Sequence, residues 1–459
     1  MRPSITTEVV NFILQQDAPP AAVMEKAGDH ILDGIAVMLA GSRTECVQTL
    51  GALIQEQGSV PTSTLLGFNG KAAPADAALV NGTSGHADDY DDTQLSTSPD
   101  RIYGLLTHPT VPVLAAALAI GEVKGCSGRA LLEAFIVGFE VECKLAEAIK
   151  PEHYTRGFHT TGTIGAFGAA AAASRLLDLD EDAVRRAIGV TASLSAGIRV
   201  NFGTMTKPLH AGRAAANGVT ACLLAQKGFT ADHEALDGRW GFLQVLGGGV
   251  DPEKLVDRLG EPYAILDPGA SIKMYPCGSL GQPSMDALRE IVVEEDLTVE
   301  DVRAIRLRAG PNILEPLRYT QPVNELQAKF SLQFGLAAIL VKRRAGLREY
   351  TTEVVNSPRI QKAMAKVTTH LDPEVARLGT EKMRSILEVE LASGRVIRRI
   401  ADTARGTPEK PVTKGELEAK FRECASFVLA NDHVEKAVAV IRHLADLPAI
   451  PHLTGLLKR

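Results

Sequence analysis

The chain has 459 residues, of which 45% are hydrophobic and 23% charged, a composition that predicts two or three globular domains with a substantial core. Its formal net charge is -6 and no long block of Lys or Arg occurs, so we expect no nucleic-acid partner. The cysteines form no C-x-x-C pair, the N-terminus lacks a signal-peptide profile, and the most apolar stretch is too short to span a bilayer, which together predict a cytoplasmic protein without a membrane span.

Helical periodicity dominates the first 245 residues. Apolar or small residues recur at spacings of three and four in segments 26–39, 129–149, 163–177, 181–192 and 211–226. No strand pattern interrupts these segments at βαβ intervals, which argues against a dinucleotide-binding fold. Aromatic residues make up only 5% of the chain while Ala and Gly are abundant, so we expect helices that approach one another closely.

The pattern changes in the middle of the chain. Residues 302–308, 386–391 and 396–401 alternate apolar and charged side chains, as half-buried strands do. Residues 392–395 between the last two have the composition of a hairpin turn. After Pro408 and Pro411, helical periodicity returns over residues 414–444.

These patterns predict a mainly α protein. We expect a large all-helical domain built from both chain ends, residues 1–266 and 407–459, and an inserted smaller α+β domain, residues 267–406.

Two polar segments with histidines lie in the helical region. NGTSGHADDYDDT (residues 81–93) places four carboxylates within five positions, so some of them must be neutralised by cations, hydrogen bonds or protonation. A solvated loop and a functional site containing His86 both fit this segment. His108 in THP (residues 107–109) precedes the most apolar helix, where a structural and a functional histidine are both reasonable.

Three further segments place His, Lys or Tyr among small residues. In GFHTTGTIGAFGAA (157–170), glycines recur every three residues, Thr160 or Thr161 can cap the helix, and His159 stands at its N-terminal mouth; plain helix packing is the alternative. NFGTMTKPLHAG (201–212) surrounds Lys207 with neutral residues, which favours a partly desolvated lysine. ASIKMYPCGS (270–279) contains Lys273 and Tyr275. Taken alone, either lysine could be a surface charge.

Taken together, these segments resemble the MmgE/PrpD family, which includes 2-methylcitrate dehydratase, cis-aconitate decarboxylase and iminodisuccinate epimerase. The resemblance runs over nearly the whole chain and is most specific in HADDYDDT, GFHTTGTIGAFGAA, NFGTMTKPLHAG, IKMYPC and RYTQPVNELQAKFS (318–331). It implies that the α+β domain is a lid, that the protein is a homodimer, and that a cofactor-free site lies between the domains. The family's active-site positions fall on Asp89, Thr93, His108, His159, Lys207, Lys273 and Tyr319.

Two departures from the family pattern are visible. The stretch between Thr93 and His108 is longer than in the decarboxylases, and Gly281-Gln282-Pro283 stands where many members have a His before Pro.

We therefore expect a lyase, a dehydratase or decarboxylase, that moves a proton next to a carboxylate of a small di- or tricarboxylic acid without a metal or other cofactor. An isomerase or epimerase of an amino- or imino-dicarboxylate could use the same groups, and the sequence leaves open which histidine is the base. The expected catalytic residues are His108, His159, Lys207, Lys273 and Tyr319. The expected substrate-binding residues are Asp89, Thr93, Arg199, His210 and Tyr275.

Arg199 lies eight residues before Lys207, among Gly197, Ile198 and Val200, and so needs an anionic partner. Asp88 or Asp91 within the chain, or a carboxylate of the substrate, could provide it.

Two other classes of protein remain as alternatives. Residues 88–92, DDYDD, match the D-D-x-x-D motif with which all-helical isoprenoid synthases hold magnesium, but no second acidic motif accompanies it. The spacing of His86, His108 and His159 predicts no tight metal motif. A non-catalytic helical scaffold has no reason to gather His, Lys and Tyr in Gly-rich turns.

Overall fold

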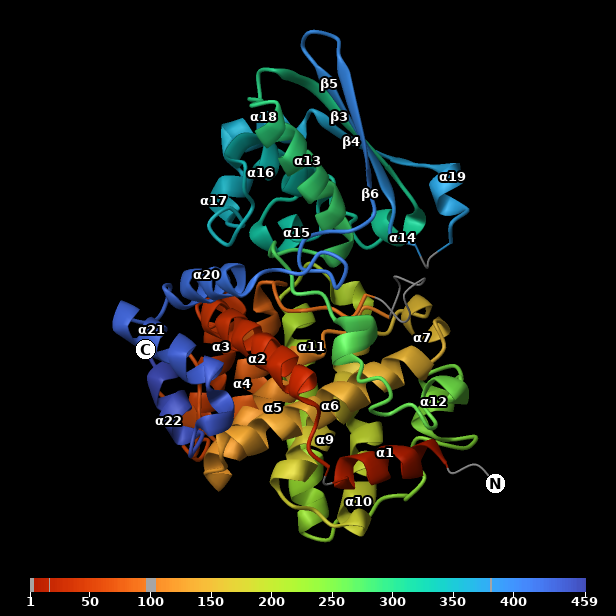
Figure 1. Cartoon of the computed structure of the whole chain (residues 1–459), viewed down its shortest axis with the longest axis vertical. Helices are drawn as coiled ribbons and strands as arrows, with labels where there is room; N and C mark the ends of the chain where they lie inside the picture. Colours follow the sequence, from red (N-terminus) through yellow and green to blue (C-terminus); the bar gives the residue numbers. More distant parts are fainter. Residues whose placement is uncertain (1–3, 16, 96–104, 380–381) are drawn as a thin grey trace.

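The computed structural model describes residues 4–15, 17–95, 105–379 and 382–459. The protein is mainly α, with two small sheets. In the view of Figure 1, the helices of the first half of the chain and those of the C-terminus fill the lower part, and a sheet with its covering helices forms the upper part. Of the longer stretch between Thr93 and His108, residues 96–104 lie outside the described residues.

The lower part is built from long helices joined by short ones. The long helices of the first half are α1 (Ile5–Leu14), α2 (Ala21–Gly41), α3 (Glu45–Glu56), α4 (Pro74–Ala87), α5 (Thr110–Lys124), α6 (Gly128–Ala148), α9 (Gly165–Leu176), α10 (Glu181–Leu194) and α11 (Thr206–Gln226). The shorter helices are α7 (Glu152–Thr155), α8 (Thr160–Thr163) and α12 (Phe242–Val245). All five helices predicted from periodicity are present, as α2, α6, α9, α10 and α11.

We had expected the lower part to be entirely helical, but it also contains a small sheet. Two antiparallel strands, β1 (Ser63–Thr64) and β2 (Lys71–Ala72), follow α3. Each strand has only two residues, too few to produce an alternating pattern in the sequence, and Gly67 with φ of 74° forms part of the turn between them.

The C-terminal helices return to the lower part, as predicted. They are α20 (Lys414–Ala425), α21 (Asn431–Arg442) and α22 (Pro451–Thr454), and a capping box between Thr413 and Glu416 begins α20. One hydrophobic core joins residues of both chain ends, among them Ile35 of α2 and Phe421 of α20.

A second hydrophobic core lies under the larger sheet in the upper part. The strands are β3 (Val302–Ala309), β4 (Val367–Leu371), β5 (Ser385–Leu391) and β6 (Val396–Ala401), in the order β4-β3-β5-β6. β4 is parallel to β3 and the other neighbours are antiparallel. The helices are α13 (Gln282–Glu294), α14 (Pro311–Leu314), α15 (Glu325–Ala328), α16 (Leu332–Lys342), α17 (Thr352–Val355), α18 (Pro358–Met364) and α19 (Pro373–Ala376).

The structure confirms the three predicted strands and the β5–β6 hairpin. β4 was missed because Val367 is its one buried residue, so this edge strand shows no apolar alternation. The domain boundaries at 266/267 and 406/407, and movement of the smaller part as a lid, stay predictions.

Glycines let the long helices cross at close range. A Cβ atom on Gly82 of α4 would lie 2.8 Å from the Cα of Gly212 of α11, and one on Gly212 would lie 2.3 Å from the carbonyl oxygen of Leu79. A Cβ on Gly138 of α6 would lie 2.5 Å from the carbonyl oxygen of Gly168 of α9. These contacts confirm the expected close packing, and the first crossing brings together the end of α4 and the start of α11.

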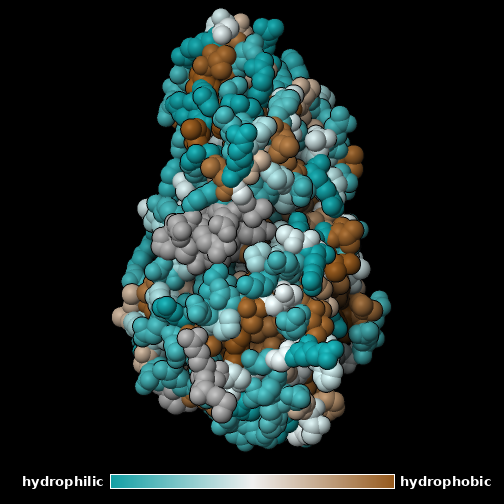
Figure 2. Space-filling model, turned by 90° about the vertical axis from the view of Figure 1, so that its right-hand side faces the viewer, coloured by the Kyte–Doolittle hydropathy of each residue, from teal (hydrophilic) through white to brown (hydrophobic). Residues whose placement is uncertain are grey.

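Among the described residues, none of the helices is long and apolar enough to cross a bilayer. The face in Figure 2 is largely hydrophilic, with hydrophobic side chains in isolated groups that are broader over the lower part.

Candidate active site

The acidic segment after α4 is buried: residues 88–93 all lie in the interior. The solvated-loop interpretation is therefore wrong, and the carboxylates need partners inside the protein. Asp88 pairs with Lys329 at 3.4 Å and with Arg43 at 3.5 Å. Asp92 accepts from the Thr110 hydroxyl at 2.6 Å and lies 2.8 Å from Nδ1 of His30.

Asp89 lies between two buried lysines. Lys207 Nζ donates to its Oδ1 at 2.6 Å, and Lys273 Nζ lies 3.2 Å from the same oxygen and donates to the Asp89 carbonyl at 3.0 Å. Burial alone would raise the pKa of Asp89, but the two ammonium groups hold it far below its ordinary value. Burial lowers the pKa of Lys207, and the neighbouring Lys273 adds to this effect. Asp89 has φ of 52°, a left-handed conformation that aspartate tolerates better than most residues.

His86 connects the remaining carboxylate to this cluster. Its Nδ1 lies 2.8 Å from Asp91 Oδ2 and its Nε2 lies 2.8 Å from Lys207 Nζ. An ammonium group only donates, so Nε2 accepts and the Nδ1–H donates to Asp91. Burial lowers the pKa of His86 to about 3, consistent with a neutral ring that holds Lys207 in place. His86 was not among the expected site residues, although its position in HADDYDDT could have indicated it.

His108 follows the segment that runs from Thr93. Its Nδ1 lies 2.7 Å from the carbonyl oxygen of Asp92, which can only accept, so the ring proton is on Nδ1. In the neutral ring Nε2 then carries a lone pair. The backbone N–H of His108 donates to the Thr161 hydroxyl at 3.1 Å. We had expected Thr160 or Thr161 to cap the helix, but α8 begins after His159 without a side-chain cap. The Thr161 hydroxyl accepts from His108 instead.

His159 is buried, and its Nε2 has no hydrogen-bond partner among the described residues. Its Nδ1 lies 3.0 Å from Nδ1 of His210. Burial, and then the charge of Lys207, hold the pKa of His159 well below its ordinary value. The ring is therefore neutral, with one nitrogen free to act on a ligand.

These groups line one cavity of about 430 Å³, its mouth included. The polar lining residues are Asp89, Thr93, His108, Tyr154, His159, Lys207, Lys273 and Ser279. The apolar lining includes Leu106, Phe202, Leu280, Leu317 and Phe330. Ser279, which was not among the expected site residues, lies with its Oγ 2.9 Å from Thr93 Oγ1. Both parts of the molecule contribute, because residues 278–280, 316–317 and 330 come from the sheet-bearing part.

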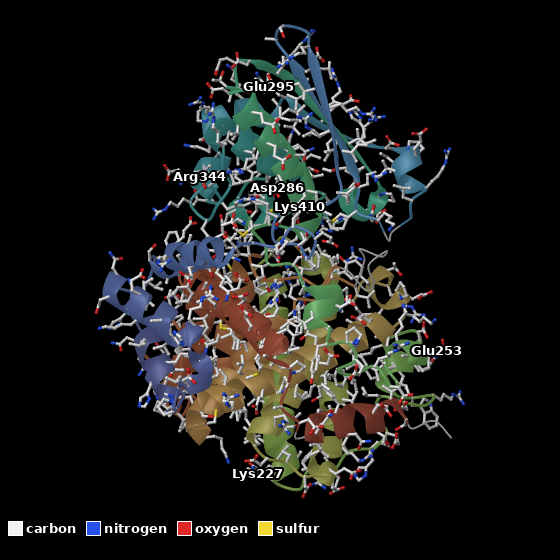
Figure 3. All side chains as sticks on the ribbon, viewed as in Figure 1. Lys227, Glu253, Asp286, Glu295, Arg344 and Lys410 are labelled. Atoms are coloured by element: carbon white, nitrogen blue, oxygen red, sulfur yellow. The ribbon has the colours of Figure 1, made fainter. Side chains whose placement is uncertain are left out.

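Four expected residues are not part of the described cavity lining. The Tyr319 hydroxyl donates to the carbonyl of Phe202 at 3.1 Å. The Tyr275 hydroxyl donates to Asp286, which lies near the junction of the two parts in Figure 3. The other two contact lining residues without lining the cavity themselves: His210 contacts His159, and Arg199 contacts Tyr154.

Arg199 has a partner that we had not considered. Its guanidinium lies 3.7 Å from the centre of the Tyr154 ring and donates to the Tyr154 carbonyl at 2.9 Å. The two internal candidates, Asp88 and Asp91, pair with other residues, so that expectation was wrong. A role for Arg199 toward a substrate carboxylate stays a prediction.

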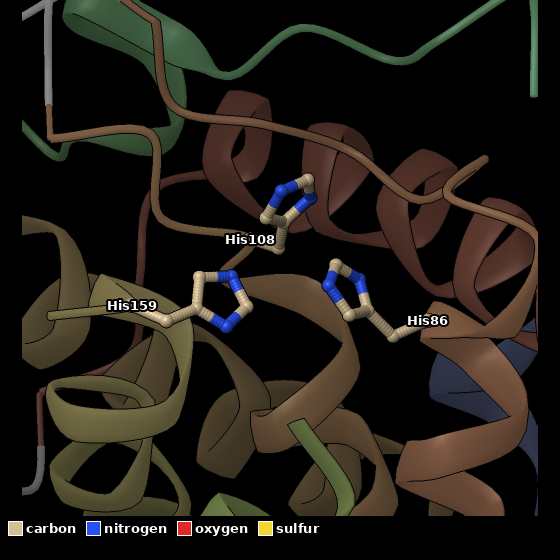
Figure 4. A group of neighbouring side chains, drawn as sticks. All are labelled: His86, His108 and His159. Atoms are coloured by element: carbon tan, nitrogen blue, oxygen red, sulfur yellow. The ribbon is translucent and has the colours of Figure 1, made fainter. Parts of the chain in front are cut away.

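The three histidines come together in space, contrary to what their spacing predicted. Ligand atoms of His86, His108 and His159 lie within 4.8 Å of one another, close enough to hold a metal ion (Figure 4). Both nitrogens of His86 are engaged, however, and a cation there would meet the ammonium group of Lys207. The magnesium interpretation of DDYDD fits poorly too, because its four carboxylates already pair with protein groups.

Comparison with known proteins identifies the family of this chain. Models of the MmgE/PrpD N-terminal and C-terminal domains match residues 9–255 and 275–446. The human cis-aconitate decarboxylase is 29% identical over 447 residues, covering 95% of this chain and 90% of that protein. The mouse cis-aconitate decarboxylase is 28% identical, with 95% and 89% covered, and that of Aspergillus terreus is 25% identical, with 99% and 96% covered. With both domain models matched in order along the chain, this protein belongs to the MmgE/PrpD family.

Proposed function

We propose that this chain is a lyase that releases carbon dioxide from a small tricarboxylate of the cis-aconitate type. The observation that carries the proposal is the pair of buried ammonium groups, Lys207 and Lys273, that share the single carboxylate of Asp89 in the cavity lining. Among the lining residues two ammonium groups face the one carboxylate of Asp89, with His108 and His159 beside them, while the carboxylate of Asp91 lies outside the lining against His86. Such a lining suits an anionic substrate. The named activity of the relatives supports decarboxylation over the other reactions of the family.

The reaction needs support for negative charge that develops on carbon. Cleavage of the carbon–carbon bond releases carbon dioxide and leaves its electron pair on the substrate, delocalised onto a neighbouring carboxylate. Lys207 and Lys273 would stabilise this enolate-like dianion, and the hydroxyls of Thr93 and Ser279 would orient the carboxylates. The apolar lining on the other side keeps water away, which strengthens the electrostatic support.

A proton must then reach the carbanion. His108 presents a bare Nε2 in its neutral form, which suits a base, and His159 presents an unpartnered Nε2. Dehydration and epimerisation would begin from the same type of intermediate. For epimerisation, Tyr319 would have to leave its bond to the Phe202 carbonyl to reach the opposite face.

Product analysis in deuterated water tests the proposal. The purified protein is incubated with cis-aconitate, trans-aconitate, citrate, 2-methylcitrate or iminodisuccinate, and products are followed by NMR. We expect carbon dioxide release and one carbon-bound deuterium from cis-aconitate, with the rate unchanged by EDTA. Lys273→Met should abolish turnover, whereas Lys458→Met, near the C-terminus, should not. Turnover of iminodisuccinate alone, or loss of activity on chelation, would refute the proposal.

The lid and the homodimer belong to the same proposal. Closure of the sheet-bearing part over the cavity would exclude water while the carbanion exists. Solution scattering with and without a bound tricarboxylate measures closure, and light scattering measures the mass in solution. Identical scattering profiles, or a monomeric mass, would count against these two expectations.

A further inference from the structure

We propose that His159 and His210 form a two-imidazole relay that carries a proton between solvent and the cavity. The inference rests on the proposed function, since decarboxylation consumes one proton for each product formed. The polar side chains that line the cavity are buried, so this proton needs a route to the reacting carbon. We had expected His210 to bind substrate; in this proposal it instead passes a proton to His159.

The geometry provides both ends of the relay. His159 is 1% exposed and lines the cavity, and its Nε2 has no hydrogen-bond partner among the described residues. Its other nitrogen meets Nδ1 of His210 at 3.0 Å, a hydrogen bond in which either ring can donate. His210 is 8% exposed, against 1% for His159, so it lies nearer to solvent than His159 does.

The backbone packs closely around His210. A Cβ atom on Gly197 would lie 3.3 Å from Cγ of His210, and one on Gly162 would lie 3.1 Å from its Cβ. The backbone N–H of His159 donates to the carbonyl oxygen of Gly197 at 3.0 Å. Gly197 therefore contacts both histidines, and a larger side chain at either glycine would crowd His210.

Both rings are neutral, as a relay requires. Burial, and then the charge of Lys207, lower the pKa of His210 to about 4, and burial lowers that of His159 as well. A neutral imidazole carries one N–H and one lone pair and can donate and accept at once.

The transfer balances with water as the only other reactant. The Nε2–H of His159 goes to the carbanion, the Nδ1–H of His210 goes to Nδ1 of His159, and solvent water protonates Nε2 of His210 and is left as hydroxide. Both rings end neutral, in their other tautomers. When the product leaves, water enters the cavity and protonates Nε2 of His159; the Nδ1–H of His159 then returns to His210, whose Nε2–H neutralises the hydroxide left in solvent. The hydroxide that remains, from the water that entered the cavity, combines with the released carbon dioxide as bicarbonate, so each cycle consumes one water. His108, whose ring proton is held by the Asp92 carbonyl, takes no part in this transfer.

Two variants separate a relay from a structural role. His210→Asn keeps a polar atom near the position of Nδ1 but cannot pass a proton between two nitrogens, and His210→Ala opens space for added imidazole. For both we expect kcat to fall about tenfold to a hundredfold, the scale of a general acid–base group, with KM within about twofold of wild type. Imidazole should restore much of kcat in His210→Ala and leave wild type unchanged. If His210→Asn keeps kcat within about twofold of wild type, or imidazole fails to rescue His210→Ala, the relay is wrong.

A measurement without substrate keeps this test independent of the proposed function. Nitrogen-15 NMR of histidine-labelled wild-type protein should show a proton shared between the two Nδ1 atoms, and His210→Asn should lose it. Absence of that shared proton in wild type would overturn the relay whatever the substrate. Failure of wild type to turn over any polycarboxylate would refute the proposed function and leave the NMR result to decide the relay.

Discussion

Replacement of Lys420 by Met should reveal how the C-terminal helix supports the candidate site. Lys420 of α20 is 3% exposed, and its Nζ lies 2.6 Å from Oδ1 of Asp33 in α2. The same ammonium group donates to the carbonyl oxygens of Tyr90 at 2.9 Å and of Lys273 at 2.8 Å. One lysine from the end of the chain therefore ties together the segments that carry Asp89 and Lys273.

The magnitude follows from the burial of the pair. Removal of one partner from a buried ion pair costs about 3–5 kcal/mol, because the other charge is left uncompensated. Burial already raises the pKa of Asp33 to about 6 despite the pull of Lys420, and without the lysine that pKa should rise further. A carboxyl whose pKa is higher in the folded state stabilises it most at low pH and loses that contribution as pH rises through the folded pKa. The variant's deficit should therefore grow between about pH 5 and pH 8.

Urea unfolding followed by circular dichroism at pH 5 and pH 8 measures this deficit. Adding Asp33→Asn to Lys420→Met should recover part of the lost free energy of unfolding and remove the added pH dependence. Lys436→Met, an exposed lysine on α21, is the control and should change stability by less than about 0.5 kcal/mol. An equal deficit at both pH values, or no recovery in the double variant, would refute the reasoning.

Three other outcomes are expected. Lys207→Ala and His159→Ala should each lower turnover by about a hundredfold or more, with little change in melting temperature. Steady-state kinetics measures the turnover and calorimetry the stability. A fall in stability while activity survives would show that the residue is structural. Burial raises the pKa of Glu147 to about 8, so the free energy of unfolding should fall as pH rises from about 5 to 8. In thermal melts at several pH values, Glu147→Gln should reduce this pH dependence. The control Glu133→Gln, on the same helix, should leave it unchanged. Gly212→Ala should destabilise the α4–α11 crossing by about 2 kcal/mol or more, whereas Gly415→Ala, with open space around it, should not; equal melting temperatures would contradict this.

Local patterns in the sequence predicted much of the secondary structure. Periods of three to four residues predicted the long helices, and alternation predicted β3, β5 and β6, because a half-buried element repeats its apolar residues at its own period. The same reasoning missed β1, β2 and β4, which are too short or too exposed to show a period.

The sequence also indicated that the carboxylates of residues 88–92 need neutralising groups, since like charges so close repel each other. It did not indicate which group meets which carboxylate. That Asp89 takes both Lys207 and Lys273 follows from the crossing of α4 and α11 and from the segment at 273, not from spacing along the chain. The pair of Asp91 with His86 is local, within the same segment.

By itself, then, the sequence determined the family motifs and the mainly α architecture. Only the tertiary structure decided that His86 supports Lys207, that Arg199 stacks on Tyr154, and that His210 stands behind His159. Periodicity reports which side of one element is buried. Contacts such as that between His86 and Lys207, 121 residues apart, depend on how separate elements pack, and that is set by the whole core at once.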